Sequence, residues 1–395
     1  MGDRRQHETH QHTDELVTWA EIDLDAIAYN VRAFRRHVGE RVEVFAVVKA
    51  NAYGHGAAPV ARAALEAGAT RLAVHRLSEG IELRQGGIEA PVLIMGYTPP
   101  AAAESAVRWR LTPSLITAEF ALALAARAQA AGVIVPVHLK VDTGMGRYGL
   151  MPGEAPEFAA WLQGLDGIRL EGVFTHFATA DAADQVQLRR QLGVFDDVLA
   201  ALRAAGITPL AHAANSAATM HLPGSHLQAV RVGIAMYGLE PSSEWPPLFE
   251  IRPALTLKSR VSRVRDLPAG SGISYGHTYV TSAPATVALV PVGYGDGYHR
   301  VLSNRASVLI RGQRAPVRGR VCMDQFVVDV TQLPGVAQDD EVVLVGRQGK
   351  EQVRAEEVAQ LAGTINYEVT TSLLPRVARV YVRGGQIVDI ISQND

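Results

Sequence analysis

The chain has 395 residues, 48% hydrophobic and 20% charged, with a formal net charge of -2 at pH 7, a balance typical of a globular protein with two domains. The near-neutral charge argues against a nucleic-acid or anionic-membrane partner, and no apolar run reaches the roughly 18 residues of a membrane helix. The single cysteine, Cys322, excludes an intrachain disulfide and favours a cytoplasmic location.

Residues 1–18 are polar and show no apolar period, which predicts a disordered tail. The tail carries His7, His10 and His12, which could bind a metal weakly, but a solvated tail is the stronger interpretation and no metal site is expected. Residues 19–24 alternate like a strand, and Asp25 is predicted to cap the helix that follows.

A regular alternation of apolar runs and alanine-rich helical segments then extends over about 200 residues. The eight runs are 45–49, 71–74, 92–95, 111–116, 133–141, 170–176, 210–215 and 230–237. This alternation predicts a (β/α)8 barrel over residues 19–250. A doubly wound open sheet is the alternative, but no G-x-G-x-x-G turn follows an early strand.

The pattern changes after Pro241, and further prolines place a domain boundary near residue 250. Beyond it, short β-rich runs with glycine and proline turns predict an antiparallel barrel or sandwich over residues 251–395. These runs are 255–264, 285–292, 306–310, 327–330, 341–345 and 377–382, and one helix is predicted near 354–363.

A lysine ends the first run of the barrel. Lys49 closes a continuous apolar stretch, and a loop containing Gly54 and Gly56 follows it. A lysine at the end of a buried strand is costly to desolvate unless it is paired or used. It either reaches the surface with its ammonium group or serves as a Schiff-base lysine with a lowered pKa.

Other polar residues stand at the same end of the predicted barrel, which is where such barrels carry their active sites. They are His138, Lys140, Asp142, Arg147, His176, Asn215, Ser216, Arg231 and Gly233. Structural alternatives exist, because Lys140 and Asp142 could form an internal salt bridge, and Asn215 with Ser216 could only cap a helix. As a set, these residues indicate a phosphate-bearing aldehyde held by a lysine, which describes pyridoxal phosphate.

From about Trp19 to the C-terminus the chain resembles the alanine racemases, pyridoxal-phosphate enzymes of fold type III. The motifs that carry the resemblance are AVVKANAYGHG at 46–56, KVDTGMGR at 140–147, HFATAD at 176–181, ANSAA at 214–218, RVGIAMYG at 231–238, SYG at 274–276, CMDQ at 322–325 and INYE at 365–368. Gly295 departs from the alanine more usual in the family, and we expect this difference to matter little.

The resemblance implies an isomerase that interconverts L-alanine and D-alanine and supplies D-alanine for peptidoglycan. It implies that Lys49 and Tyr275 transfer the Cα proton on opposite faces of the substrate, with Lys49 also the Schiff-base lysine. The implied cofactor contacts are Lys49, Tyr53, His176, Asn215, Ser216, Arg231, Gly233, Ile234 and Tyr367. Arg147 and Met323 are the implied substrate contacts, and Lys140 is a candidate for carbamylation by CO2.

The resemblance also implies a head-to-tail homodimer in which each barrel receives Tyr275 and Met323 from its partner. Three alternatives remain open at this point. One is a fold III amino-acid decarboxylase, for which Cys322 would be the product-protonating group, although the Tyr275 motif and Arg231 favour a racemase. The others are a broad-specificity amino-acid racemase and a non-catalytic pyridoxal-phosphate carrier, and the β-rich C-terminal region argues against the carrier.

Overall fold

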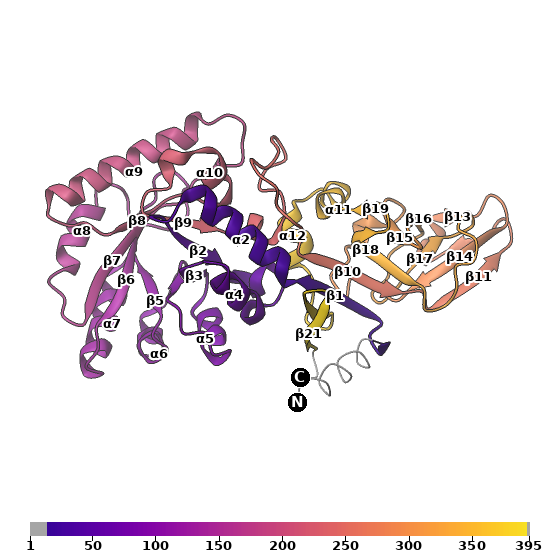
Figure 1. The fold of residues 1–395 in the computed structure, drawn as a ribbon, viewed down its shortest axis with the longest axis horizontal. Coiled ribbons are helices and arrows are strands. Elements are labelled where there is room, and N and C mark those ends of the chain that lie inside the picture. The colour runs from indigo at the N-terminus through magenta and orange to yellow at the C-terminus, as the bar shows by residue number, and fades with distance from the viewer. Residues whose placement is uncertain (1–13, 393–395) are drawn as a thin grey trace. The chain divides into compact units, whose positions relative to one another are not determined.

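The computed structural model describes residues 14–392, and Figure 1 shows its ribbon. The chain divides into two compact units. The barrel unit consists of Ile27–Ala52 and Ala57–Ile251, and the β unit consists of the chain up to Ala26, Tyr53–Gly56 and the chain from Arg252 onward. The predicted tail with its three histidines lies, up to residue 13, outside the described residues.

Eight parallel strands close the barrel in chain order, so the predicted (β/α)8 fold is confirmed and the doubly wound sheet is wrong. Each of the eight predicted runs overlaps one strand, with ends that differ by a few residues. The strands are β2 (Glu43–Val47), β3 (Arg71–Val74), β4 (Val92–Ile94), β5 (Thr112–Leu115), β6 (Val135–Lys140), β7 (Ile168–Phe174), β8 (Leu210–His212) and β9 (Ala229–Val232).

Helices surround the strands of the barrel unit, as Figure 1 shows for α5 to α9. They are α4 (Ala57–Glu66), α5 (Leu77–Gln85), α6 (Ala103–Arg108), α7 (Ala118–Ala130), α8 (Ala155–Leu162), α9 (Val186–Ala204) and α10 (Ser216–His221). Alanine has the highest helix propensity, and its small side chain lets a helix lie close to the sheet. The buried faces of α4 and α7 are accordingly rich in alanine.

Helix α2 (Leu24–Val38) begins with a different cap from the one predicted. Oδ1 of Asp23 accepts hydrogen bonds from the amides of Asp25 at 2.8 Å and Ala26 at 2.9 Å. Asp23 therefore satisfies the first amides of the helix, and the prediction of Asp25 as the cap is wrong. Asp25 instead accepts a hydrogen bond from the amide of Gly384.

The β unit contains a mixed sheet in the order β11-β14-β17-β16-β15-β18-β10-β1-β20-β21, with β19 paired to β18. Its strands are β1 (Thr18–Asp23), β10 (Leu255–Arg260), β11 (Arg263–Leu267), β14 (Ala285–Val290), β15 (Ser307–Ile310), β16 (Gln313–Arg318), β17 (Phe326–Asp329), β18 (Glu341–Gln348), β19 (Glu351–Val353), β20 (Ala378–Arg383) and β21 (Gln386–Ile391). All pairs are antiparallel except β1 with β20, so the expectation of a wholly antiparallel unit is wrong at this pair.

Strand β1 belongs to the β unit, although residues 19–250 were predicted to form the barrel. Both of its edges are paired, with β10 on one side and β20 on the other, and such pairing is not apparent from local sequence. Leu16 packs against the buried cluster of Trp19, Ala378 and Val380. The prediction of a disordered tail is therefore wrong from Leu16 to Thr18.

Two short helices follow one another in the β unit where one was predicted. They are α11 (Ala355–Ala362) and α12 (Asn366–Thr371), and Gly363 ends the first of them in a left-handed conformation. The run 255–264 also divides into two strands, because β10 pairs with β1 and β18 whereas β11 pairs with β14. Within residues 14–392, none of the helices combines the length and apolar character needed to traverse a bilayer.

Candidate active site

Lys49 follows β2 and opens a left-handed turn of the backbone. Residues 50–53 all have φ between 51 and 53°, although none of them is glycine. This conformation costs roughly 1–2 kcal/mol for each such residue, so neighbouring contacts must stabilise it. Consecutive strained residues next to a strand-end lysine indicate a functional position rather than an ordinary loop.

Hydrogen bonds within the barrel unit hold this turn. The amide of Ala50 donates to Oε1 of Glu79 at 2.6 Å, and the amide of Ala52 donates to the carbonyl of Val48 at 2.9 Å. Oδ1 of Asn51 accepts from the amide of Ala57 at 2.8 Å and so connects the turn to the start of α4. The direction in which the chain leaves Lys49 is therefore fixed on both sides of the turn.

The Lys49 amine has a lowered pKa. Burial is the largest cause, and the positive charges of Arg147 and Arg231 lower it further, while Glu79 opposes them. A lower pKa increases the neutral, nucleophilic fraction of the amine at neutral pH.

Arg231 on β9 is a buried arginine, 2% exposed, whose terminal nitrogens donate only to neutral acceptors. Nη1 donates to Nδ1 of His212 at 2.8 Å and to its carbonyl at 3.0 Å. Nη2 donates to the carbonyls of Thr175 at 2.7 Å and Ala213 at 2.9 Å. Nε has no acceptor among residues 14–392, so this one N–H remains available for a bound group.

The charge of Arg231 affects its neighbours. Burial lowers the pKa of Arg231 to about 9, which still leaves the guanidinium charged at neutral pH. His176 follows β7, and its Nδ1 accepts a long hydrogen bond of 3.4 Å from Nη2 of Arg231. Burial first, and the Arg231 charge second, hold the pKa of His176 well below its usual range, so this imidazole is neutral.

The loop that carries Arg147 is organised by Asp142. Oδ1 of Asp142 accepts from the amides of residues 144, 145 and 146, and Oδ2 accepts from the amide of Arg147 at 2.7 Å. Burial raises the pKa of Asp142, but these backbone hydrogen bonds outweigh it and the net shift is downward. Asp142 thus anchors the loop that carries Arg147.

Lys140 lies at the end of β6 and is 7% exposed. Its Nζ donates to the carbonyl of Met95 at 3.4 Å and lies over the rings of Tyr148 and Phe174 at 4.9 and 5.4 Å. No ion pair joins it to Asp142 in the described part of the chain, so the alternative of an internal salt bridge is wrong. Burial, with Arg231 and Arg147 nearby, lowers the pKa of Lys140 to about 8.

Hydrogen bonds connect the start of α10 with the loop after β9. Oγ of Ser216 accepts from the amide of Gly233 at 2.9 Å, which leaves its own O–H free to donate to an anion. Oδ1 of Asn215 accepts from the amide of Ala218 at 3.0 Å. Asn215 therefore caps α10, as the structural alternative proposed, and the cap orients Ser216 beside it.

Ile234 follows Gly233 in the barrel unit, and the other predicted site residues belong to the β unit. The rings of Tyr53 and Tyr367 are 6.1 Å apart at 49°, and Arg379 Nε donates to the carbonyl of Gly54 at 3.1 Å. Tyr275 is 73% exposed and Met323 is 54% exposed, and both line a cavity of 830 Å³. The structure thus gathers the predicted residues in two sets, one on each unit.

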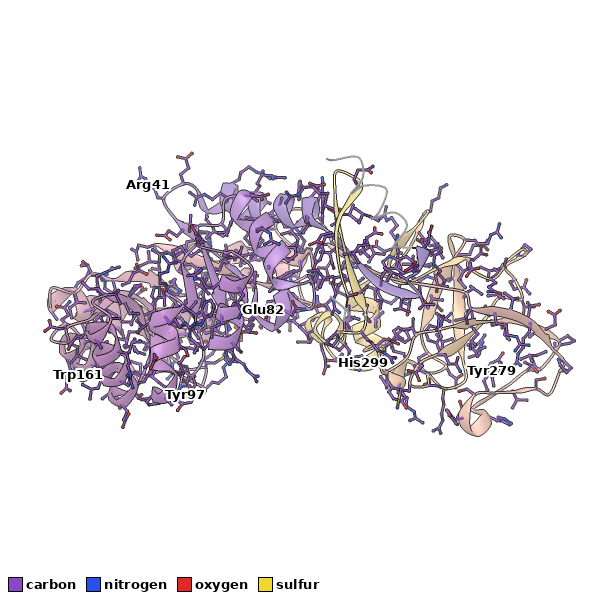
Figure 2. The ribbon with its side chains drawn as sticks, turned by 90° about the horizontal axis from the view of Figure 1, so that it is seen from below. Arg41, Glu82, Tyr97, Trp161, Tyr279 and His299 are labelled. Atoms are coloured by element: carbon purple, nitrogen blue, oxygen red, sulfur yellow. The ribbon has the colours of Figure 1, made fainter. Side chains whose placement is uncertain are left out.

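The turn that presents Tyr275 is strained and anchored. Ser274 has φ 62°, and its Oγ donates to the carbonyl of Arg320 at 2.7 Å. The small sheet next to the turn contains β12 (Gly272–Ile273) and β13 (Tyr279–Val280). The Arg318 guanidinium lies 4.7 Å from the ring centre of Tyr279, which Figure 2 labels, and this contact holds β13 against β16.

Met323 is held by a contact network that the sequence did not indicate. Arg376 Nε donates to Oδ1 of Asp296 at 2.6 Å, and its Nη1 donates to Oδ1 of Asp324 at 2.9 Å. The carbonyl of Met323 accepts from the amide of Gly295 at 2.8 Å and from Nη2 of Arg376 at 3.4 Å. These partners are 52 to 80 residues from Arg376 in sequence, so no local pattern could reveal them.

Gly295 lies in close contact with two loops, and the expectation that its departure from alanine matters little stays a prediction. A Cβ at this position would lie 2.6 Å from Nη2 of Arg376 and 3.0 Å from the Met323 carbonyl oxygen. Arg376 cannot move away without losing its hydrogen bonds to Asp296 and Asp324. Glycine therefore lets the two loops approach closely.

We expect Gly295→Ala to raise KM for the substrate by about threefold to tenfold with a smaller change in kcat, since overpacking costs about 1 kcal/mol or more and displaces Met323. Steady-state kinetics check this. Gly193→Ala is the matched control, because an added Cβ there meets nothing within 4 Å. An unchanged KM in Gly295→Ala would contradict the role given to this contact.

Comparison with known proteins covers nearly the whole chain. Residues 22–241 match the family model "Alanine racemase, N-terminal domain", and residues 254–381 match "Alanine racemase, C-terminal domain". The alanine racemase of Desulfovibrio desulfuricans is 47% identical over 365 residues, which span 92% of this chain and 98% of that protein.

Solved structures give the same result. The alanine racemase of Bacillus anthracis, solved with bound L-Ala-P, superposes with a TM-score of 0.90 at 42% identity, covering 95% of this chain and 97% of that one. A histidine racemase of Leuconostoc mesenteroides superposes with a TM-score of 0.86 at 28% identity, covering 93% and 99%. Racemases that are named for different amino acids therefore share this fold.

Proposed function

Since the chain belongs to the alanine racemase family, we propose that Lys49 and Tyr275 are the two groups that carry out its interconversion of L-alanine and D-alanine. Racemisation removes the Cα proton from one face and returns a proton on the other, so two acid/base groups on opposite faces are required. The observation that supports Lys49 most strongly is its amine of lowered pKa, on a strained turn at the carboxyl end of a barrel strand.

The residues of the barrel unit fit pyridoxal phosphate. Lys49 would bind its aldehyde, and the Ser216 hydroxyl with the amide of Ile234 would bind its phosphate. The amide of Gly233, which donates to Oγ of Ser216 in this structure, would join them by exchanging that acceptor for the phosphate. Arg231 would hold the ring nitrogen through its Nε–H, and because arginine cannot accept a proton, it would favour an unprotonated ring nitrogen. When bound, the cofactor supplies an electron sink for the charge left on Cα.

Other residues of the proposed site would support the cofactor contacts or bind the substrate. Asn215 contributes through the cap that orients Ser216, and His176 contributes through its contact with Arg231. Tyr53 and Tyr367 would add hydroxyl groups to the phosphate contacts. Arg147 would bind the substrate carboxylate through its planar fork of donors, together with the backbone amide of Met323.

The proposed site requires a second subunit. We propose a head-to-tail homodimer in which Tyr275 and Met323 of each chain serve the barrel of the other. The high exposure of both side chains supports this arrangement, because a catalytic tyrosine acts best when it is desolvated. A cytoplasmic location, supported by the single cysteine, completes the proposal.

Substrate preference tests the proposed function directly. With added pyridoxal phosphate, we expect kcat/KM to be highest for alanine and lower for serine, because one added hydroxyl changes binding only modestly in a small pocket. Lysine and histidine should react far more slowly. Chiral chromatography of the products checks this order, with CO2 release from ornithine and diaminopimelate as the control for decarboxylation. A higher kcat/KM for serine, lysine or histidine, or CO2 release, would contradict it.

We also propose that Lys140 is carbamylated. Its pKa of about 8 leaves a substantial neutral fraction at pH 8, and the neutral amine adds CO2 to give a carbamate anion and one proton. The product would replace a cation near Arg147 by an anion able to hold the guanidinium.

Carbon NMR with isotopically labelled bicarbonate checks the modification. We expect one protein-bound carbamate signal that grows as pH rises through 8 at constant dissolved CO2, because deprotonation exposes the reactive amine. The signal should vanish in Lys140→Arg, since arginine does not form the carbamate. A wild-type protein without the signal, or a signal that persists in Lys140→Arg, would contradict the assignment.

A further inference from the structure

A row of three polar side chains extends from Arg231 into the barrel interior. None of the three takes part in the proposed reaction. Nδ1 of His212 lies 2.8 Å from Nη1 of Arg231, and Nε2 of His212 lies 2.8 Å from Nδ1 of His138. Nε2 of His138 lies 3.3 Å from Oε2 of Glu171. Both histidines are 0% exposed, and they come from β8 and β6, while Glu171 comes from β7.

The chemistry of the groups fixes the direction of every hydrogen bond in this row. Arginine has only donors, so Nδ1 of His212 must accept and the proton of its neutral ring must be on Nε2. That Nε2–H donates to Nδ1 of His138, whose proton is therefore also on Nε2. His138 then donates to the carboxylate of Glu171, which accepts only. A single pair of tautomers satisfies all of these groups.

Packing holds the two rings in this arrangement. The His212 ring is stacked between Phe45 at 4.9 Å and 16° and Phe174 at 4.8 Å and 7°. His138 occupies space opened by Gly172 on the neighbouring strand, where a Cβ would lie 2.4 Å from Cε1 of the imidazole. Neither ring can turn over without displacing an aromatic ring or the β7 backbone.

The row connects the buried cation of Arg231 to a carboxylate. None of the atoms that accept from Arg231 within residues 14–392 belongs to a carboxylate, although an unpaired buried cation is costly. The carboxylate at the far end of the row is Glu171, which Arg71 also contacts at 2.7 Å. The His138 hydrogen bond first, and the charge of Arg71, lower the pKa of Glu171 to about 2 against the effect of burial. Glu171 is therefore a permanent anion.

We propose that His212, His138 and Glu171 form a relay of fixed tautomers that keeps Arg231 oriented, which makes them positioning residues for the ring-nitrogen contact of the cofactor. This proposal rests on the proposed function only in naming that contact, because the relay itself is a property of the protein. Without the relay, Arg231 can rotate away from the ring nitrogen, which can then gain a proton. A protonated ring withdraws electrons more strongly and favours transamination over racemisation.

The tautomers can be observed directly by nitrogen NMR on the holoenzyme labelled at histidine. The charged groups that face the two rings are Arg231, Arg71 and Glu171, and Arg231 and Arg71 disfavour protonation of the rings. Between pH 6 and 9 we expect both rings to remain neutral with the proton on Nε2, assigned by comparison with His138→Gln. A protonated ring, or a proton on Nδ1 of either ring, would overturn the proposal whether or not the protein racemises alanine.

Variants test the consequence for the reaction. His138→Leu interrupts the relay, whereas His138→Gln keeps an acceptor for His212 and a donor for Glu171. We expect His138→Leu to lower kcat with little change in KM and to raise the ratio of transamination to racemisation by about tenfold or more, and His138→Gln to recover most of the wild-type ratio. Glu43→Gln is the matched control, because Glu43 pairs with Arg71 but touches neither histidine.

Folding is checked by thermal unfolding and by the absorbance of bound cofactor. If His138→Leu does not fold, the test uses Glu171→Gln instead. This variant keeps a hydrogen-bond acceptor for His138 and removes the negative charge. The NMR result on the wild-type protein does not depend on either variant. A folded His138→Leu or Glu171→Gln protein with the wild-type reaction ratio would overturn the proposal. A protein without racemase activity but with the expected tautomers would contradict the proposed function and leave the relay in place.

Discussion

Replacing Lys49 by alanine is expected to reduce racemisation of alanine at least about a thousandfold in both directions, because the variant loses a proton-transfer group and the amine that would bind the cofactor aldehyde. The lowered pKa of Lys49 and its position on a strained turn support this role. Chiral analysis of product formation from each enantiomer measures the effect.

Exchange of the Cα proton in deuterated water tests separately which face of the substrate Lys49 serves. If Tyr275 serves the opposite face, Lys49→Ala with bound cofactor should still exchange the Cα proton of one enantiomer slowly and without inversion. Lys350→Ala is the control, because Lys350 is an exposed lysine on a surface turn and should leave activity unchanged. More than a tenth of wild-type activity in Lys49→Ala, or equal exchange of both enantiomers, would contradict the assignment.

Mixing Lys49→Ala chains with Tyr275→Phe chains is expected to restore activity that neither variant has alone. In a dimer with shared sites, each mixed dimer has one site with both lesions and one intact site. Random exchange makes half of the dimers mixed, so about one quarter of wild-type activity should return. The 73% exposure of Tyr275 in its own chain supports this outcome.

The alternative is a site built from a single chain, in which every site in the mixture keeps one lesion and stays inactive. Subunit exchange must be shown independently, by native mass spectrometry of chains with different tags. Each variant incubated alone under the same conditions provides the background. Exchanged subunits without recovered activity would exclude the shared site.

The alternation of apolar runs with alanine-rich segments was sufficient to predict the barrel from sequence. A parallel strand covered on both faces is apolar throughout, so each of the eight runs marks its strand without knowledge of its neighbours. The pattern also places Lys49, Lys140 and Arg231 in or next to barrel strands before any tertiary contact is known, although the observed strand ends differ by a few residues. Local sequence determined these features because they depend on residues close together in the chain.

Tertiary structure alone decided the features that depend on distant partners. The sequence could not place β1 in the β unit, because its pairing with β10 and β20 joins segments more than 200 residues apart. It could not show that Arg376 holds Met323, nor that Asp142 anchors a loop instead of pairing with Lys140. His138 was recognised by position, but its partners His212 and Glu171 became apparent only when three strands met. Hydrogen bonds between distant segments leave no periodic trace in sequence, so their geometry is determined only by folding.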